Sequence, residues 1–203
     1  HLREGFATLE RQVFQGTGHK SDGFNGLPDE LNALSLDTVV DGGGSGSNLS
    51  SVYFIRTNDD HMDCSVVLGQ EGNIAIGETL LQEVNDTSSP EKHYMAYVTP
   101  IGAWAGLQVG GQWSVVRLAN VDNLTDDLLS QALEVFPSGM QPTFIAMTRQ
   151  KRGKLQRSRT TYSPSGMPAP RPQEYEGFPI VTTDQISNTE TAVASFAVAK
   201  SRQ

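Results

Sequence analysis

The first candidate for chemistry is the glycine-rich run DGGGSGSN, residues 41–48. Phosphate-binding loops carry Lys and Ser or Thr directly after their second glycine, where these side chains reach phosphate and magnesium. Here Ser47 and Asn48 follow instead, and the dinucleotide-binding pattern is also missing. Gly43–Gly46 is out of register with the G-x-S-x-G turn that exposes a nucleophilic serine. The composition therefore predicts a flexible linker and no nucleotide site.

A second candidate is a metal site around His61, Asp63 and Cys64. Zinc sites need three or four ligands with further support, and a second group of ligands is missing. The remaining histidines are isolated in the sequence: His1, His19 and His93. Asp59 and Asp60 are typical turn residues. We predict a solvated turn that leads into a strand, with Cys64 as a small buried side chain, and neither metal nor cofactor.

The neighbouring carboxylates Asp126 and Asp127 could suggest acid–base catalysis. On a helix, adjacent residues point to different sides, so these two cannot flank one bond as a glycosidase pair must. Their place in the first turn of a predicted helix favours a role with the helix dipole. We find no catalytic constellation and expect no enzyme.

A basic segment stands out in an otherwise acidic chain. The net charge is -8 at pH 7, and no acid occurs between Glu134 and Glu174. The segment carries six cations: Arg149, Lys151, Arg152, Lys154, Arg157 and Arg159. DNA, a membrane, an acidic neighbouring subunit or solvent could face it. Because no aromatic side chain is interleaved to stack on bases, we favour a subunit contact or a solvated helix face over nucleic acid.

The elements that hold these residues follow from local patterns. Apolar residues at helical spacing predict a helix over Leu2–Gln15, which Gly16 ends. Pro28 and Asp29 open a short helix over Leu27–Leu36. In the middle of the chain, two hairpins are expected, with a polar loop from Asn85 to Lys92 between them. The first joins Val52–Arg56 to Cys64–Leu68, and the second joins Ile101–Val109 to Trp113–Leu118 through Gly110–Gly111.

The last third alternates helices and strands. Thr125 caps one predicted helix, and Thr148 caps another that carries the basic residues to about Arg157. Strands are predicted at Phe144–Met147 and Phe178–Val181. The fold class is therefore α+β.

Size and composition set further bounds. The 203 residues suffice for one domain or two closely packed lobes. A single cysteine cannot form an internal disulfide, which suits the bacterial cytoplasm. No apolar run is long enough to cross a membrane, so we expect no membrane partner.

Several blocks of the sequence resemble the major capsid proteins of short-tailed and related tailed phages. The longest runs from Phe136 to Glu190 and contains FPSGMQPTFIAMTRQKRGKLQRSRTTYSPSGMPAPRPQEYEGFPIVTTDQISNTE. Earlier blocks in the same order are LERQVFQGTG, FNGLPDEL, GGGSGSNLSSVYFIRTN, GNIAIGE and HYMAYVTPIGAWAGLQVGGQWSVVRLANV. Together they cover most of the chain.

The resemblance implies a Hong Kong 97-like capsid fold and a structural virion protein. Copies of the chain would form hexamers and pentamers of an icosahedral shell, assembled in the bacterial cytoplasm, that encloses double-stranded DNA without sequence-specific binding. Scaffold, portal and decoration proteins are the further partners it suggests.

The resemblance also divides the chain. The expected parts are the end of the spine helix (1–16), loop and linker (17–50), a β-rich peripheral lobe (51–119), an axial α/β lobe (120–190) and a C-terminal tail (191–203). We expect the chain to be truncated at its N-terminus, without the N-terminal arm and extended loop that interlock neighbours in such proteins.

The alternative interpretation is a β-rich module of a phage particle that binds a receptor or carbohydrate. Exposed Trp104 and Trp113 would grip the sugar in that case. Since both lie among Ile, Leu and Val, we expect them to pack in the core instead.

Overall fold

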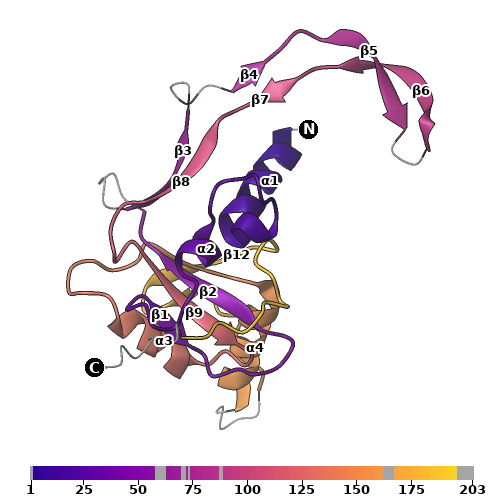
Figure 1. The fold of residues 1–203 in the computed structure, drawn as a ribbon. Coiled ribbons are helices and arrows are strands. Elements are labelled where there is room, and N and C mark those ends of the chain that lie inside the picture. Colours follow the sequence, from indigo (N-terminus) through magenta and orange to yellow (C-terminus); the bar gives the residue numbers. More distant parts are fainter. Residues whose placement is uncertain are drawn as a thin grey trace, which may run out of the picture. The chain divides into compact units, whose positions relative to one another are not determined.

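The structure is a computed structural model that describes residues 2–57, 63–69, 72, 74–86, 89–161 and 167–195. The chain divides into two compact units. Residues 1–65 and 107–203 form the first, which we call the sheet unit, and residues 66–106 form the second, which we call the ribbon. Figure 1 shows the elements of both.

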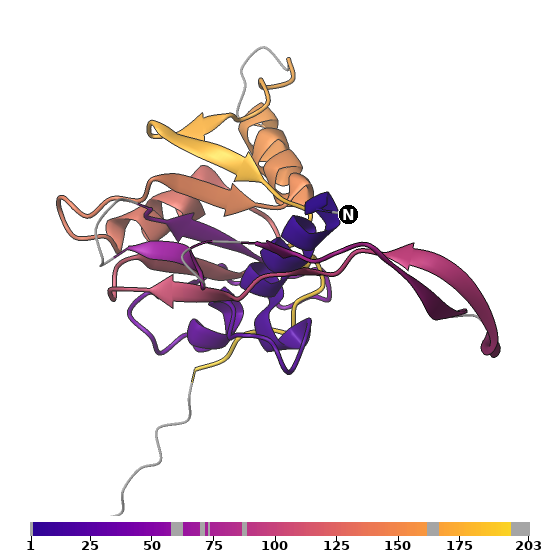
Figure 2. The same ribbon diagram turned by 90° about the horizontal axis from the view of Figure 1, so that it is seen from above.

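A mixed six-stranded sheet is the centre of the sheet unit. Its strands, in spatial order, are β1 (Val39–Asp41), β9 (Val115–Val121), β2 (Ser50–Ile55), β10 (Phe144–Met147), β12 (Phe178–Thr182) and β11 (Glu174–Tyr175). The pairs β1–β9 and β10–β12 are parallel, and the other pairs are antiparallel. With the helices, this sheet confirms the predicted α+β class (Figure 2).

Helices cover both faces of the sheet, so β2 and β9 are buried along their whole length. The helices are α1 (Leu2–Gln15), α2 (Leu27–Glu30), α3 (Asp126–Glu134) and α4 (Arg149–Thr161), and a 3-10 turn, η1 (Gly16–Gly18), follows α1. Because side chains alternate along a strand, Val52 and Phe54 pack in the core beneath α3 and α4. Tyr53 and Ile55 pack with residues of α1 and α2 on the opposite face.

Three helix termini agree with their local sequence signals. The helix α1 ends at Gln15, and Gly16 follows with a φ of 55°. The hydroxyl of Thr125 accepts a hydrogen bond from the backbone N–H of Leu128 at the start of α3. Thr148 does the same for Lys151 at the start of α4. These predictions depend only on neighbouring residues, which explains why they are confirmed.

Three successive two-stranded ladders make up the ribbon and its junction with the sheet unit, and the pairs β4–β7 and β5–β6 are antiparallel. They pair β3 (Cys64–Leu68) with β8 (Ala105–Val109), β4 (Ala75–Ile76) with β7 (Ile101–Gly102), and β5 (Leu80–Asp86) with β6 (Ser89–Val98). The long strands β5 and β6 can be followed in Figure 2. A separate unit of paired strands at this place in the chain was not predicted from the sequence.

Both predicted hairpins are wrong. The strand β2 pairs with β9 and β10, whereas β3 pairs with β8. The stretch predicted as one strand over residues 101–109 is two short strands, and neither pairs with β9. Each interior strand of this sheet is hydrogen-bonded to two other strands, and most of these are distant in sequence. The glycines between consecutive strands therefore did not identify which strands pair.

Other expectations need correction as well. The helix expected over residues 27–36 ends at Glu30. The polar stretch 85–92 belongs largely to β5 and β6, apart from residues outside the described part. The boundary expected between 119 and 120 does not separate compact units, since β2 and β9 share one sheet with β10 and β12.

The first part of the glycine-rich run continues the sheet, which the flexible-linker prediction did not include. The N–H of Gly42 donates to the carbonyl oxygen of Ala119 at 2.7 Å, and that of Gly44 donates to Asn120 at 2.9 Å. A Cβ atom at Gly44 would lie 2.4 Å from the Asn120 oxygen. These glycines continue the pairing of β1 with β9. Their backbone lies so close to the backbone of β9 that a side chain would not fit between them.

We therefore predict that Gly44→Ala lowers the free energy of unfolding by about 1–3 kcal/mol, because the new methyl group would displace the backbone of β9. Urea unfolding of the subunit measures the change. Gly46→Ala is the matched control, since a Cβ atom there has no neighbour within 4 Å. Equal stability of the two variants would contradict the close approach at Gly44.

Candidate functional site

A buried arginine lies at the centre of the sheet unit. Arg117 of β9 is 3% exposed, and its guanidinium lies 5.8 Å from the centre of the Tyr53 ring. Its Nε donates to Ser51 Oγ at 2.8 Å, and Nη1 donates to the Leu31 carbonyl at 2.7 Å. Nη2 donates to Glu190 Oε2 at 2.9 Å. One carboxylate and several neutral oxygens thus compensate the charge, as a buried cation requires.

Glu190 belongs to a C-terminal segment, residues 183–195, which we call the strap. Polar anchors hold it along its length, and apart from Ile186 and Thr183 its side chains are at least partly exposed. The anchors join Thr183 to Glu10, Gln185 to Arg11 and Gln15, Ser187 to Ser50, Asn188 to Thr148, Glu190 to Ser51 and Leu49, Val193 to Asn120, and Ala194 to Leu34. The strap therefore ties α1, β2, β9 and the start of α4 together.

Asn120 is the second main anchor of the strap. Its backbone φ is 53°, an unusual value for a residue other than glycine within a strand. The side chain exchanges two hydrogen bonds with the backbone of Val193, at 2.7 and 2.9 Å, and also donates to Asp41 at 3.0 Å. Asn120 thus connects the strap, β9 and the start of the glycine-rich run.

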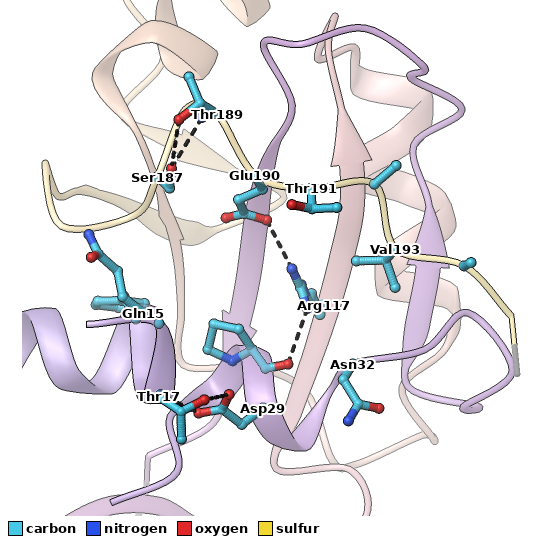
Figure 3. Close-up of a pocket in the computed structure, with 15 residues that line it drawn as sticks. Gln15, Thr17, Asp29, Asn32, Arg117, Ser187, Thr189, Glu190, Thr191 and Val193 are labelled. Carbon is cyan, nitrogen blue, oxygen red and sulfur yellow. Dashed lines mark hydrogen bonds and ion pairs between the residues drawn. The ribbon is translucent and has the colours of Figure 1, made fainter. Parts of the chain in front are cut away.

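A groove of about 660 Å³ lies between the strap and the α1–α2 corner (Figure 3). Its charged lining residues are Arg117, Glu190 and Asp29. Arg117 and Glu190 bind each other, while Asp29 accepts from backbone and hydroxyl groups of its own corner. Because these charges are already satisfied within the chain, the groove fits a structural role better than catalysis.

Asp29 fixes the turn from α1 into α2. Its carboxylate accepts hydrogen bonds from the N–H and hydroxyl of Thr17, at 2.8 and 2.6 Å, and from the N–H of Gly26 at 2.9 Å. Partial burial by itself would raise the pKa of Asp29. The hydrogen bonds outweigh burial and hold that pKa below its ordinary value of 3.8.

The basic helix α4 finds its acidic partners inside the same chain. Lys154 pairs with Asp122 at 2.6 Å, and Arg159 forms a forked pair with Asp126. Arg149 pairs with Asp184. Arg152 donates to the Pro172 carbonyl. These four cations therefore have oxygen partners within the chain, while the Arg149–Asp184 pair remains largely exposed to solvent.

Lys151 is the unusual member of this helix, because it is 1% exposed. Its ammonium donates to the carbonyls of Asn48 and Asp122, at 2.8 and 3.1 Å. Burial lowers the pKa of Lys151, and the charge of Lys154 lowers it further. No local feature of the sequence distinguishes this buried lysine from the more exposed cations around it.

The metal-site candidates do not come together. His61 lies outside the described residues, Asp63 forms an ion pair with Arg56, and Cys64 is buried. Burial, with the nearby Asp63 charge, raises the pKa of the Cys64 thiol to about 11. Over the residues that the structure describes, no group of three His, Cys, Asp or Glu side chains could hold a metal ion.

The remaining candidates are also dispersed. His93 contacts Asn85 on the ribbon, and His19 is half-buried behind α1, whereas His1 is outside the described part. Asp126 binds Arg159, while Asp127 accepts from Gln131 one helical turn away. As expected, these two carboxylates face different partners.

The ribbon carries most of the uncovered apolar surface. Ten of the fifteen exposed large hydrophobic side chains in the described part of the chain lie between residues 66 and 106. Trp104 is 72% exposed, so the prediction that it packs in the core is wrong, whereas Trp113 is half-buried. Concentrated apolar surface of this kind marks a site of protein association.

Comparison with known proteins identifies the family of this chain. The family model for the major capsid protein GP7 matches residues 6–194. The chain belongs to this family of major capsid proteins. It is therefore a structural capsid subunit, and the receptor- or carbohydrate-binding alternative is not favoured. No curated protein matches the chain significantly.

A solved bacteriophage structure agrees with this assignment at the level of the fold. The chain is similar to a protein chain in the structure of bacteriophage Epsilon15, with 18% sequence identity and a TM-score of 0.50. The match covers 95% of this chain and 67% of the other. Separately, no helix in the described part of this capsid protein is long and apolar enough to span a membrane.

We predict that Glu190→Gln lowers the free energy of unfolding of the capsid subunit by about 3 kcal/mol, because it leaves the buried Arg117 without a counter-charge. The side chains of this pair are 4% and 13% exposed. Asp184→Asn removes the partner of Arg149, where the side chains are 65% and 60% exposed, and provides the control. Urea unfolding should show little change for the control, since exposed pairs are screened by solvent.

Asp29→Asn tests the carboxylate at the α1–α2 corner by its pH dependence. Because the folded-state pKa is lowered, the carboxylate stabilises the fold above its unfolded-state pKa, and this contribution is lost as the pH falls through the folded-state value. The variant should be less stable than the wild type at neutral pH, and the difference should begin to shrink below about pH 4 and be lost only below the lowered folded-state pKa. Urea unfolding as a function of pH measures this, with the exposed Asp22→Asn as control. A constant difference at all pH values would contradict the proposed origin.

Proposed function

We propose that this major capsid protein is the repeating subunit of an icosahedral shell with a Hong Kong 97-like fold, which encloses phage double-stranded DNA. The observation that carries the proposal is the match to the capsid family over residues 6–194, together with the apolar ribbon. Many modest contacts, repeated over a closed shell, stabilise it without any single tight interface.

The parts of the chain fit different places in such a subunit. We propose that α1 is the end of the spine helix. The axial lobe would combine β10, β12, α3 and α4 from residues 120–190 with β2 and β9 from the segment expected to be peripheral. Their common sheet supports this grouping. The ribbon would be the extended loop that contacts neighbouring subunits.

The charge distribution supports a shell that encloses DNA without binding it tightly. The chain carries a net charge of -8, and five cations of α4 are engaged by oxygens of the same chain. Cations that are already paired release few counterions on contact with phosphate, so they add little affinity for DNA. Hexamers and pentamers of this chain, a scaffold, a portal and decoration proteins are the further partners we propose, with assembly in the host cytoplasm.

Expression of the full-length gene with its co-encoded scaffold tests the proposal. We expect uniform closed shells in negative-stain electron microscopy and a single fast-sedimenting species. The stability-neutral variant Gly46→Ala should assemble equally well. Discrete monomers or trimers of a folded full-length protein would contradict the proposal.

A further inference from the structure

Two places on the sheet unit combine an exposed methionine with charges that have no ion-pair partner. Met140 is 44% exposed and lies in the loop that follows α3. Met167 is 68% exposed and begins the proline-rich segment, residues 167–173, which leads into β11. The unpaired charges are acidic near the first methionine and basic near the second. The two places are therefore candidates for complementary surfaces.

The basic place is centred on Arg171, which stands between Pro170 and Pro172 and is exposed. None of the ion pairs among the described residues includes Arg171. Its charged neighbour is Arg152, whose Nε donates to the carbonyl oxygen of Pro172 at 2.6 Å. Burial, with the nearby charge of Arg171, lowers the pKa of Arg152. Two like charges at one place favour an acidic partner.

The backbone that carries Arg171 is fixed against α4. The N–H of Ala169 donates to Thr160 Oγ1 at 2.9 Å, and the carbonyl oxygen of Ala169 accepts from Gln156 Nε2 at 2.7 Å. A proline on each side of Arg171 further restricts the backbone. The arginine is thus presented on a preorganised segment, so little backbone entropy would be lost when it binds.

The acidic place is a pocket of about 190 Å³ at the end of α3. Its apolar lining includes Leu133, Phe136 and Phe178, and its charged lining residues are Glu134 and Glu176. Neither carboxylate belongs to an ion pair among the described residues. The pocket is too small for a helix, which is about 10 Å wide, but it suits the end of one long side chain. An arginine would place its aliphatic stem on the apolar lining and its guanidinium near the carboxylates.

Both carboxylates occupy positions that the local structure disfavours. Glu134 is the last residue of α3, where the helix dipole favours a cation. Glu176 has a φ of 49° in the turn between β11 and β12, and Gly177 follows with a φ of 84°. Such a turn favours glycine, asparagine or aspartate. Residues that depart from local preference are typical of functional positions.

We propose that Arg171 of one copy of this chain binds in the pocket of a second copy, where its guanidinium pairs with Glu134 and Glu176. The inference rests on the proposed shell and adds a contact within it that does not involve the ribbon. Because the arginine and the pocket are different patches of one chain, each copy gives its arginine to one neighbour and receives an arginine from another. Such head-to-tail contacts close into rings, as hexamers and pentamers require.

Other partners account for only one of the two places. A DNA phosphate could meet Arg171, but the net charge of -8 opposes its approach, and the acidic pocket would remain unexplained. A metal cation could meet the two carboxylates, but it gains nothing from the apolar lining of the pocket. An arginine from a second copy uses the charges and the apolar lining together.

Exchange of the two charges tests the contact in full-length protein expressed with its scaffold. Arg171→Glu alone and Glu176→Arg alone each bring like charges together, and each should lower the yield of shells about tenfold. The double variant restores opposite charges and should recover most of the wild-type yield. Lys20→Glu makes the same change of charge at another exposed position and should assemble normally. Urea unfolding of the subunit should be unchanged, since these side chains are exposed. A double variant that assembles no better than the single variants would overturn the inference.

Disulfide crosslinking tests the head-to-tail geometry. Arg171→Cys introduces a thiol on the proline-rich segment, and Ser138→Cys introduces one beside the pocket, where Ser138 is a lining residue. Shells that contain both single variants should give covalent dimers under mild oxidation, whereas either variant alone should give none. A chain that carries both replacements should give a ladder of products up to pentamers and hexamers. A ladder that stops at dimers, or a mixture without dimers, would contradict the ring contact.

The outcomes separate this inference from the proposed function. Wild-type protein that forms no shells would contradict the proposed function. Shells that form normally with Arg171→Glu would contradict the arginine contact alone. If those shells also lost packaged DNA, Arg171 would face the genome instead of a second copy.

Discussion

The sheet unit depends on how one buried charge is compensated. Arg117 lies in a central strand whose other side chains are buried, and water cannot solvate its guanidinium there. The counter-charge comes from Glu190, which is 73 residues away in sequence. The strap must therefore cross the sheet for the core to close. Asn120 then fixes the strap a few residues farther on, and the same side chain holds Asp41 at the start of the glycine-rich run.

The sequence predicted those elements whose signals are local. The end of α1 at Gly16, the cap of α3 at Thr125 and the cap of α4 at Thr148 each depend on a few adjacent residues. The strands β2, β9, β10 and β12 could also be located approximately. The pairing partners of these strands could not be predicted. The strand β2 lies between β9 and β10, which come about 60 and about 90 residues later, and no local sequence pattern specifies which strands pair. The prediction paired consecutive strands as hairpins, and that pairing was wrong.

The partners of the candidate site residues were also not predictable from the local sequence. The cations of α4 form a conspicuous cluster in the sequence, but Asp122, Asp126 and Asp184 neutralise three of them from other segments. The local run of cations did not reveal these acidic partners, because they lie in other segments of the chain. The ribbon was missed for the opposite reason. Apolar and polar residues do not alternate along its strands, because both faces carry apolar side chains. This pattern differs from that of the usual half-buried strand.

In the shell proposed above, folding and assembly would fall largely to different parts of this capsid protein. In the sheet unit, the buried charges of Arg117 and Lys151 are compensated by oxygens of the same chain. On the ribbon, by contrast, side chains of Leu, Met and Tyr are left uncovered. Association driven by such surface is non-directional and strengthens as more area is buried. Direction must then come from the register of β5 and β6, because that register decides which side chains face each neighbour.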